Sequence, residues 1–195
     1  MTYAASFRHQ SWGEGSYELG IEVGSTEDSG LEAVLVAVWT AAGAEGCYGH
    51  GDREPEEQES VPCTVASLEE FGRLYGRVRL PSGELVACEV MVVRCGDDDG
   101  GGDWLDFGVP LSALDAVGVR YSDGRPLYRS AVMDDWLAAI AVDAFRTASF
   151  SLGAVGWNIS GLADAGELGG VMPEKRGMGY LLPRDGVLHY GAAND

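Results

Sequence analysis

The sequence predicts an α+β protein, with a mainly antiparallel sheet and two principal helices packed on one face. Apolar residues recur at helical spacing over residues 31–42 and again over 133–145, which predicts two amphipathic helices. Short segments of β character flank both stretches, and turn sequences such as Pro81-Ser82-Gly83-Glu84 join some of them into hairpins. Hairpin-linked strands combined with helices indicate one sheet with helices on one of its faces.

The first half of the chain begins with an N-terminal arm, residues 1–16. Residues 17–23 alternate apolar and polar side chains, which predicts a strand with Glu18 and Glu22 on its polar face. We expect the first helix to be capped by Ser29, with Glu32 completing a capping box. A hairpin over residues 74–94 closes this half.

The second half repeats the pattern without sequence identity to the first. Residues 104–109 predict a strand, and residues 111–117 a short helix. The second principal helix is expected to open at Asp134 or Asp135. The stretch from Phe150 to Ile159 is apolar on both faces and predicts a central strand. A last hairpin turns around Pro183-Arg184-Asp185-Gly186.

The element order is strand, helix, strand, strand, and then the same again, which suggests a tandem β-α-β-β arrangement. We expect one domain over residues 17–195, with pseudo-halves at 17–96 and 103–191. In this pattern the chain resembles the gyrase-inhibitor-type ligand-binding modules, although no sequence motif of that family accompanies it. The resemblance implies a groove between the two halves.

The composition is strongly acidic, since 13 Lys and Arg face 31 Asp and Glu, giving a formal charge of −18. Such a surface repels phosphate groups, so we expect no nucleic-acid or membrane partner. A basic protein would be attracted instead, although acidic surfaces also simply maintain solubility. No secretory signal precedes residue 17, and the longest apolar run, Ala33 to Trp39, is too short for a membrane span. We therefore expect a cytoplasmic, bacterial protein with reduced cysteines.

No recognisable catalytic or metal motif is present. Cys47 and His50 have local spacing suited to zinc or to a nucleophile and base, but no second ligand pair or orienting group accompanies them. The acidic run from Asp97 to Asp103 lacks the ligand order of a calcium loop. We expect no cofactor and no metal, and a non-enzymatic function is favoured over catalysis.

Two functional hypotheses follow. The first is an inhibitor or immunity-type protein that masks a basic protein partner through its acidic loops. Its predicted partner-binding residues are Asp52, Glu54, Glu56, Glu57, Glu59, Asp97, Asp98, Asp99 and Asp103. The alternative is a small-molecule-binding domain with an aromatic and acidic cleft between the two halves. Its predicted ligand-binding residues are Tyr17, Glu18, Glu22, Trp104 and Trp157.

Overall fold

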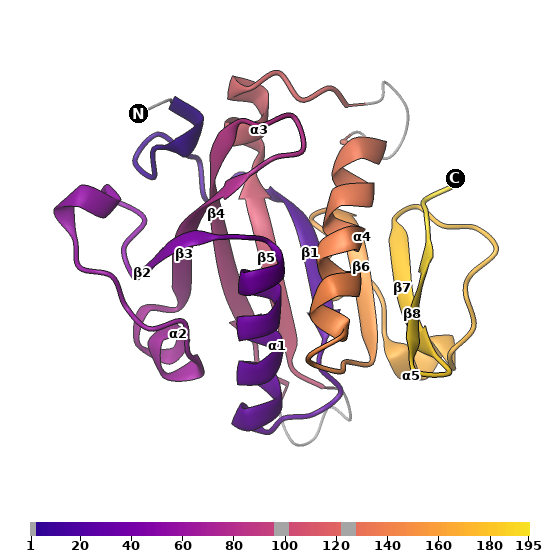
Figure 1. The fold of residues 1–195 in the computed structure, drawn as a ribbon. Coiled ribbons are helices and arrows are strands. Elements are labelled where there is room, and N and C mark those ends of the chain that lie inside the picture. The colour runs from indigo at the N-terminus through magenta and orange to yellow at the C-terminus, as the bar shows by residue number, and fades with distance from the viewer. Residues whose placement is uncertain (1–2, 96–101, 122–127) are drawn as a thin grey trace.

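The computed structural model describes residues 3–95, 102–121 and 128–195, which form one eight-stranded antiparallel sheet with helices (Figure 1). Across the sheet the strands follow the order β2-β3-β4-β5-β1-β6-β7-β8. The strands are β1 Ser16–Glu22, β2 Glu45–Tyr48, β3 Arg73–Arg79, β4 Leu85–Val93, β5 Trp104–Pro110, β6 Leu152–Trp157, β7 Gly179–Arg184 and β8 Val187–Gly191. The helices are α1 Asp28–Ala41, α2 Val65–Phe71, α3 Leu111–Ala116, α4 Ala131–Phe145 and α5 Ala165–Leu168, with 3-10 turns η1 Tyr3–Ala5 and η2 Pro55–Glu57.

Helices α1 and α4 lie side by side across one face of the sheet, which confirms the predicted α+β class (Figure 1). Each helix buries the apolar stripe that its sequence predicts, including Leu31 and Leu35 of α1 and Leu137 of α4. The alternate residues of the central strands meet these stripes, among them Leu19 of β1 and Phe107 of β5, both fully buried. The main hydrophobic core therefore lies between the sheet and this helix pair.

The strand order interleaves the two pseudo-halves. Strand β1 lies between β5 and β6, and β5 separates β1 from β4. The first strand of each pseudo-half thus pairs with the first strand of the other, from Ser16 opposite Pro110 to Glu22 opposite Trp104. The residues 17–96 and 103–191 consequently build one continuous sheet around one main core.

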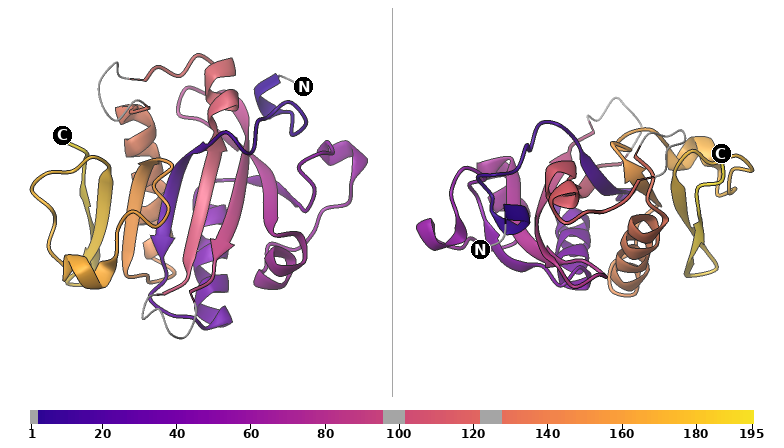
Figure 2. Two further views of the ribbon diagram at one scale, coloured as in Figure 1. Left: turned by 180° about the vertical axis from the view of Figure 1, so that it is seen from behind. Right: turned by 90° about the horizontal axis from the view of Figure 1, so that it is seen from above.

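In the part of the chain that the structure describes, the opposite face of the sheet, which we call the open face, carries no helix over its middle strands (Figure 2). Its flanks are covered by the N-terminal arm on one side and by residues after β6, including the short helix α5, on the other. The N-terminal arm lies against β3, where Phe7 and Trp12 pack on Tyr75 and the guanidinium of Arg77 donates to the carbonyl of Ala5. At the other flank, Ile159 packs against Ala154 of β6. The middle of the open face lies between these two covers.

Three local expectations differ from the structure. Residues 45–48 form an additional strand, β2, which pairs with β3. Helix α1 begins at Asp28, so Ser29 lies inside its first turn; the carboxylate of Glu32 accepts from the backbone N–H of Val65 at 3.2 Å rather than closing a capping box. Helix α4 begins at Ala131, with Ser130 rather than an Asp at its N-cap, and the backbone N–H of Ser130 donates to the hydroxyl of Tyr17.

Candidate functional site

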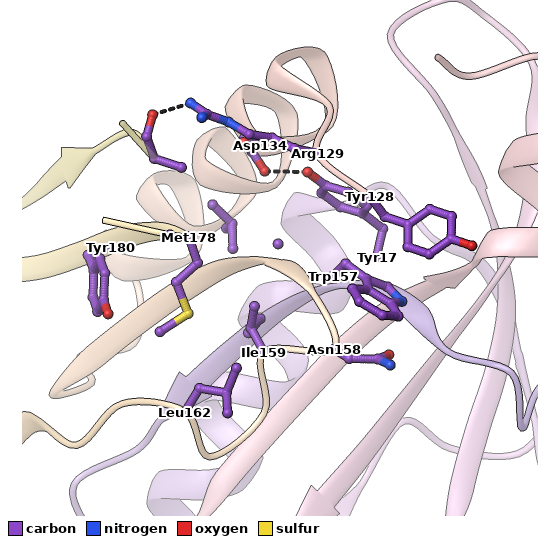
Figure 3. A pocket seen from close by; sticks show the side chains of 14 residues that line it. Tyr17, Tyr128, Arg129, Asp134, Trp157, Asn158, Ile159, Leu162, Met178 and Tyr180 are labelled. Atoms are coloured by element: carbon purple, nitrogen blue, oxygen red, sulfur yellow. Dashed lines mark hydrogen bonds between the residues drawn. The ribbon is translucent and has the colours of Figure 1, made fainter. Parts of the chain in front are cut away.

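A pocket of about 500 Å³ opens at the end of strand β6, beside the N-terminus of α4 (Figure 3). Aromatic and aliphatic side chains form most of its wall, and a few polar groups interrupt it. This composition and size are typical of small-molecule sites. The lining residues are Tyr17, Tyr128, Arg129, Asp134, Val155, Gly156, Trp157, Asn158, Ile159, Leu162, Gly177, Met178, Tyr180 and Ala193. We call this cavity the aromatic pocket.

The aromatic pocket exists because strands β6 and β7 stop pairing before β6 ends. The ladder between them runs from Gly153 opposite Leu181 to Val155 opposite Gly179, while β6 continues to Trp157 beside β1. At Asn158 the backbone takes a left-handed φ of 46°, a conformation that Asn tolerates better than most residues. The chain therefore turns away from the sheet and then returns as the pocket wall.

A buried hydrogen-bond network borders the pocket at the start of α4. The hydroxyl of Tyr17 donates to the carboxylate of Asp134 at 2.6 Å and accepts from the backbone N–H of Ser130 at 2.9 Å. Burial raises the pKa of the Tyr17 phenol far above its usual range, and the neighbouring Asp134 raises it further. Burial also raises the pKa of Asp134, although Tyr17 and Arg129 partly offset that effect. This network joins β1 to α4 and holds a carboxylate at the pocket.

The aromatic rings form a continuous chain next to this network. The rings of Tyr17 and Tyr121 are stacked, those of Tyr121 and Tyr128 meet edge to face, and Tyr128 packs on Trp157 with centroids 4.7 Å apart. Figure 3 places Tyr17, Tyr128 and Trp157 at one side of the pocket and Met178 and Tyr180 at the other. A flat apolar molecule would find ring surfaces on one side and aliphatic or thioether groups on the other.

The guanidinium of Arg129 lies at the rim and donates to the carbonyl of Ala193 near the C-terminus. This contact draws the C-terminal residues into the pocket wall (Figure 3). The positive charge of Arg129 partly offsets the burial that raises the pKa of Asp134, so one acidic and one basic side chain interact at this side of the pocket. Asp134 and Arg129 therefore lie on the same side of the pocket, while Asn158 adds a polar side chain elsewhere in a mainly apolar wall (Figure 3).

The predicted ligand-binding residues are divided between the two faces of the sheet. Tyr17 and Trp157 line the aromatic pocket. Glu18 and Glu22 point to the open face, where they accept hydrogen bonds from the backbone N–H groups of Ile159 and Ala165 at 3.0 and 2.8 Å. Trp104 is buried on the open face with Leu152 and Leu182. A single groove holding all five residues does not form, because adjacent residues of a strand face opposite sides.

The predicted partner-binding residues also have different environments. Asp52, Glu56, Glu57 and Glu59 are exposed. Glu54 is largely enclosed by the N-terminal arm, accepting from the hydroxyl of Ser6 and the backbone N–H of Phe7. Asp103 is 1% exposed and accepts from Arg94 at 2.6 Å, so it cannot contribute to an exposed acidic surface. Asp97, Asp98 and Asp99 lie outside the described residues.

The acidic loop, residues 52–59, is ordered against the rest of the fold, in contrast to the solvated loop that its composition suggests. Residues 55–57 form the turn η2, and Glu54 and Glu57 close a capping box around it. Glu57 also pairs with Arg8 at 2.6 Å. The arm and the loop thus stabilise each other through contacts between segments far apart in the sequence.

Cys47 and His50, the pair that the sequence singled out, have different neighbours in the structure. Cys47 is buried in β2, where Cys63 is its hydrogen-bond partner, and the ring of His50 packs edge-on against Phe71. Cys47, Cys63 and Cys88 are free thiols. Over residues 3–95, 102–121 and 128–195, no group of three or more His, Cys, Asp or Glu side chains is placed to hold a metal ion. In the same residues, no helix has both the length and the apolar character needed to cross a membrane.

Sequence reasoning missed most of the aromatic pocket. The sequence identifies Asp134 only as a residue that opens a helix and Met178 only as the start of a hairpin strand, and Tyr128 lies in a stretch of irregular pattern. The one available signal was the concentration of aromatic residues around position 121–128. The fold brings these segments together with Tyr17, which is more than one hundred residues away in sequence.

Comparison with known proteins does not assign this site. No family model, no curated protein and no solved structure matches the chain.

Proposed function

We propose that this protein is a small-molecule-binding domain and that its ligand occupies the aromatic pocket. The observation that carries this proposal is the cavity of about 500 Å³ with a mainly apolar wall and a few polar groups, among them Asp134 and Arg129. Pockets of this size and composition bury most of the surface of a small organic ligand. Of the two hypotheses from the sequence, this arrangement supports the small-molecule-binding domain more than the inhibitor that binds a basic protein through its acidic loops.

The wall chemistry favours a flat, apolar ligand with a positive charge. The rings of Tyr128 and Trp157 offer faces to an aromatic or cationic group. Asp134 supplies a carboxylate whose position is held by Tyr17. The guanidinium of Arg129 is already engaged by the carbonyl of Ala193, so it competes less for that carboxylate.

A pocket-filling substitution tests this proposal. Gly177 lines the pocket, and a Cβ placed on it would meet nothing within 4 Å, so Gly177→Phe is chosen to fill the cavity with a ring. We expect wild type to bind thioflavin T, a flat cationic dye, with saturable fluorescence enhancement, and Gly177→Phe to lose at least ten-fold in affinity. Gly13→Phe is the matched control, because Gly13 is also open and lies outside the lining. Equal dye binding by all three proteins contradicts the proposal.

A second candidate function is retained because the acidic loop is held in place. With Glu54 anchoring the arm, Asp52, Glu56 and Glu59 present carboxylates from an ordered surface, which suits electrostatic capture of a basic protein. We expect a partner recovered from host lysate at low salt to be lost at high salt. The double variant Glu56→Ser, Glu59→Ser should weaken recovery, whereas the charge-matched control Glu14→Ser, Glu70→Ser should not. Unchanged recovery by the first variant argues against this function.

A further inference from the structure

Three carboxylates meet on the middle of the open face, and we call Glu18, Glu89 and Asp106 the carboxylate cluster. Strand pairing places Glu18 of β1 and Glu89 of β4 on either side of Gly108, which belongs to β5. Asp106 lies on the same strand, β5, two residues before Gly108. Its neighbours on the adjacent strands are Met91 of β4 and Gly20 of β1. The cluster is therefore assembled from three adjacent strands and lies on the face opposite the main core and helices α1 and α4.

The cluster has more negative than positive charge. Arg73 pairs with Glu89 at 2.6 Å, and the hydroxyl of Ser16 donates to the same carboxylate at 3.2 Å. Glu18 accepts from the backbone N–H of Ile159, which carries no net charge. One guanidinium thus faces three carboxylates in a site where Glu89 and Asp106 are each 4% exposed. Buried carboxylates are unfavourable unless a cation or a proton compensates them.

Asp106 is the strongest sign that a group is missing. Neither of its carboxylate oxygens makes a hydrogen bond of ordinary geometry with the described residues, although both are buried. Burial raises the pKa of Asp106, and the nearby hydroxyl of Ser160 and charge of Arg73 only partly offset this. Buried polar groups in native proteins are almost always hydrogen-bonded, so a carboxylate without a partner indicates a donor that binds there.

Among the described residues no group of three or more His, Cys, Asp or Glu side chains is placed to hold a metal ion, which favours an organic donor. A guanidinium or ammonium group is larger, carries several N–H donors, and can reach more than one carboxylate. Glu18 and Arg73 are partly exposed and form the rim of the cluster above the more buried Glu89 and Asp106. We propose that the carboxylate cluster is a second binding site, which takes the guanidinium or ammonium group of a small organic cation.

Thermal unfolding at about pH 8 with agmatine as the probe tests this site. We expect agmatine to raise the melting temperature of wild type by a few degrees in a saturable manner, as a ligand of the native state does. Tetramethylammonium has the charge of an ammonium but no N–H donor, and should produce no such rise. Asp106→Asn should be stabilised by itself and should lose the response to agmatine. Glu18→Gln, which retains an acceptor for Ile159, should weaken the response.

The outcomes separate this site from the aromatic pocket. Gly177→Phe should retain the full response to agmatine, because Gly177 lines the aromatic pocket whereas Glu18, Glu89 and Asp106 are not among its lining residues. No stabilisation of wild type overturns the proposal, as does an equal effect of tetramethylammonium or a full response in Asp106→Asn. A response lost in Gly177→Phe but kept in Asp106→Asn assigns agmatine to the pocket and likewise overturns it.

Discussion

The carboxylate of Glu18 accepts a hydrogen bond from the backbone N–H of Ile159 at 3.0 Å. This contact joins the open face of β1 to the segment that lines the aromatic pocket through Asn158, Ile159 and Leu162. The carboxylate of Glu22 makes an equivalent bond, at 2.8 Å, to the N–H of Ala165. The polar face of β1 therefore positions one wall of the pocket.

Stability should depend on pH through Glu18. Burial and the neighbouring Asp106 raise its pKa from 4.5 to about 7, with Glu89 adding to the shift and the N–H groups of Ile159 and Ser160 opposing it. Because the neutral form is favoured in the folded state, the stability from this group is fully present below pH 4.5 and is lost as pH rises through about 7.

The variant Glu18→Gln should therefore lose this part of the pH dependence. At pH 8 we expect it to be more stable than wild type by roughly 1–3 kcal/mol, because it removes an unfavourable ionised group. The free energy of unfolding of both proteins is measured in urea at several pH values. The difference between them at each pH reports Glu18 separately from the titration of Glu89, Asp106 and Arg73. A difference that does not change between pH 4.5 and 8 contradicts the assignment.

Tyr17→Phe should destabilise the start of α4. The substitution removes the donor to Asp134 and the acceptor of the Ser130 N–H, both of which are buried. We expect a loss of about 1–3 kcal/mol, measured by chemical denaturation, because a buried partner is left unsatisfied. Tyr3→Phe is the control, since Tyr3 is 57% exposed, and it should change stability by less than about 0.5 kcal/mol. Equal effects of both substitutions would show that the network adds little.

Gly20→Ala should disturb the contact between β1 and the pocket wall. An added Cβ would lie 2.9 Å from Cδ1 of Ile159, so that side chain would have to shift, and 3.1 Å from the Asp106 carboxylate, which is a tight contact. Overpacking of this kind costs about 1–3 kcal/mol. Gly13→Ala meets nothing within 4 Å and should be close to neutral. The melting temperatures of both variants and wild type are compared by thermal unfolding. A Gly20→Ala protein as stable as wild type would contradict the packing described for Ile159.

Glu54→Gln should loosen the N-terminal arm. The Glu54 carboxylate accepts from the backbone N–H groups of Phe7 and Arg8 and pairs with Arg77. We expect faster amide hydrogen exchange at residues 7 and 8 and a loss of about 1 kcal/mol, because charge-assisted hydrogen bonds become neutral ones. Glu59→Gln, at an exposed position of the same loop, is the control. Unchanged exchange at Phe7 in the first variant would contradict the anchoring role.

The regular elements were largely readable from local pattern. Two apolar stripes, one containing Leu31 and the other Leu137, predict the two helices. Asp185 and Gly186, with φ values of 53° and 77°, form the expected hairpin turn. The short strand β2 was not readable, because its four residues include Gly46 and have no alternation to detect. Strand order was not readable either, since it depends on pairing between segments such as Tyr17 and Val109, far apart in sequence.

The candidate sites depended still more on tertiary contacts. A run of Asp and Glu residues looks alike in sequence whether it is exposed, as Asp52 is, or enclosed, as Asp103 is. The partners that make the difference, here Arg94 for Asp103 and the arm for Glu54, come from other segments. The acidic composition therefore predicted the charge of the surface but not which carboxylates lie on it.

The sequence by itself determined the α+β class, the two helices, most strands and the strongly acidic charge, because helical spacing, alternation and charge are properties of neighbouring residues. Tertiary structure decided which side chains meet. It brought Tyr17, Asp134 and Trp157 together at the end of β6, and Glu18, Glu89 and Asp106 together on the open face. These groupings arise from long-range strand pairing and packing, which local patterns do not encode.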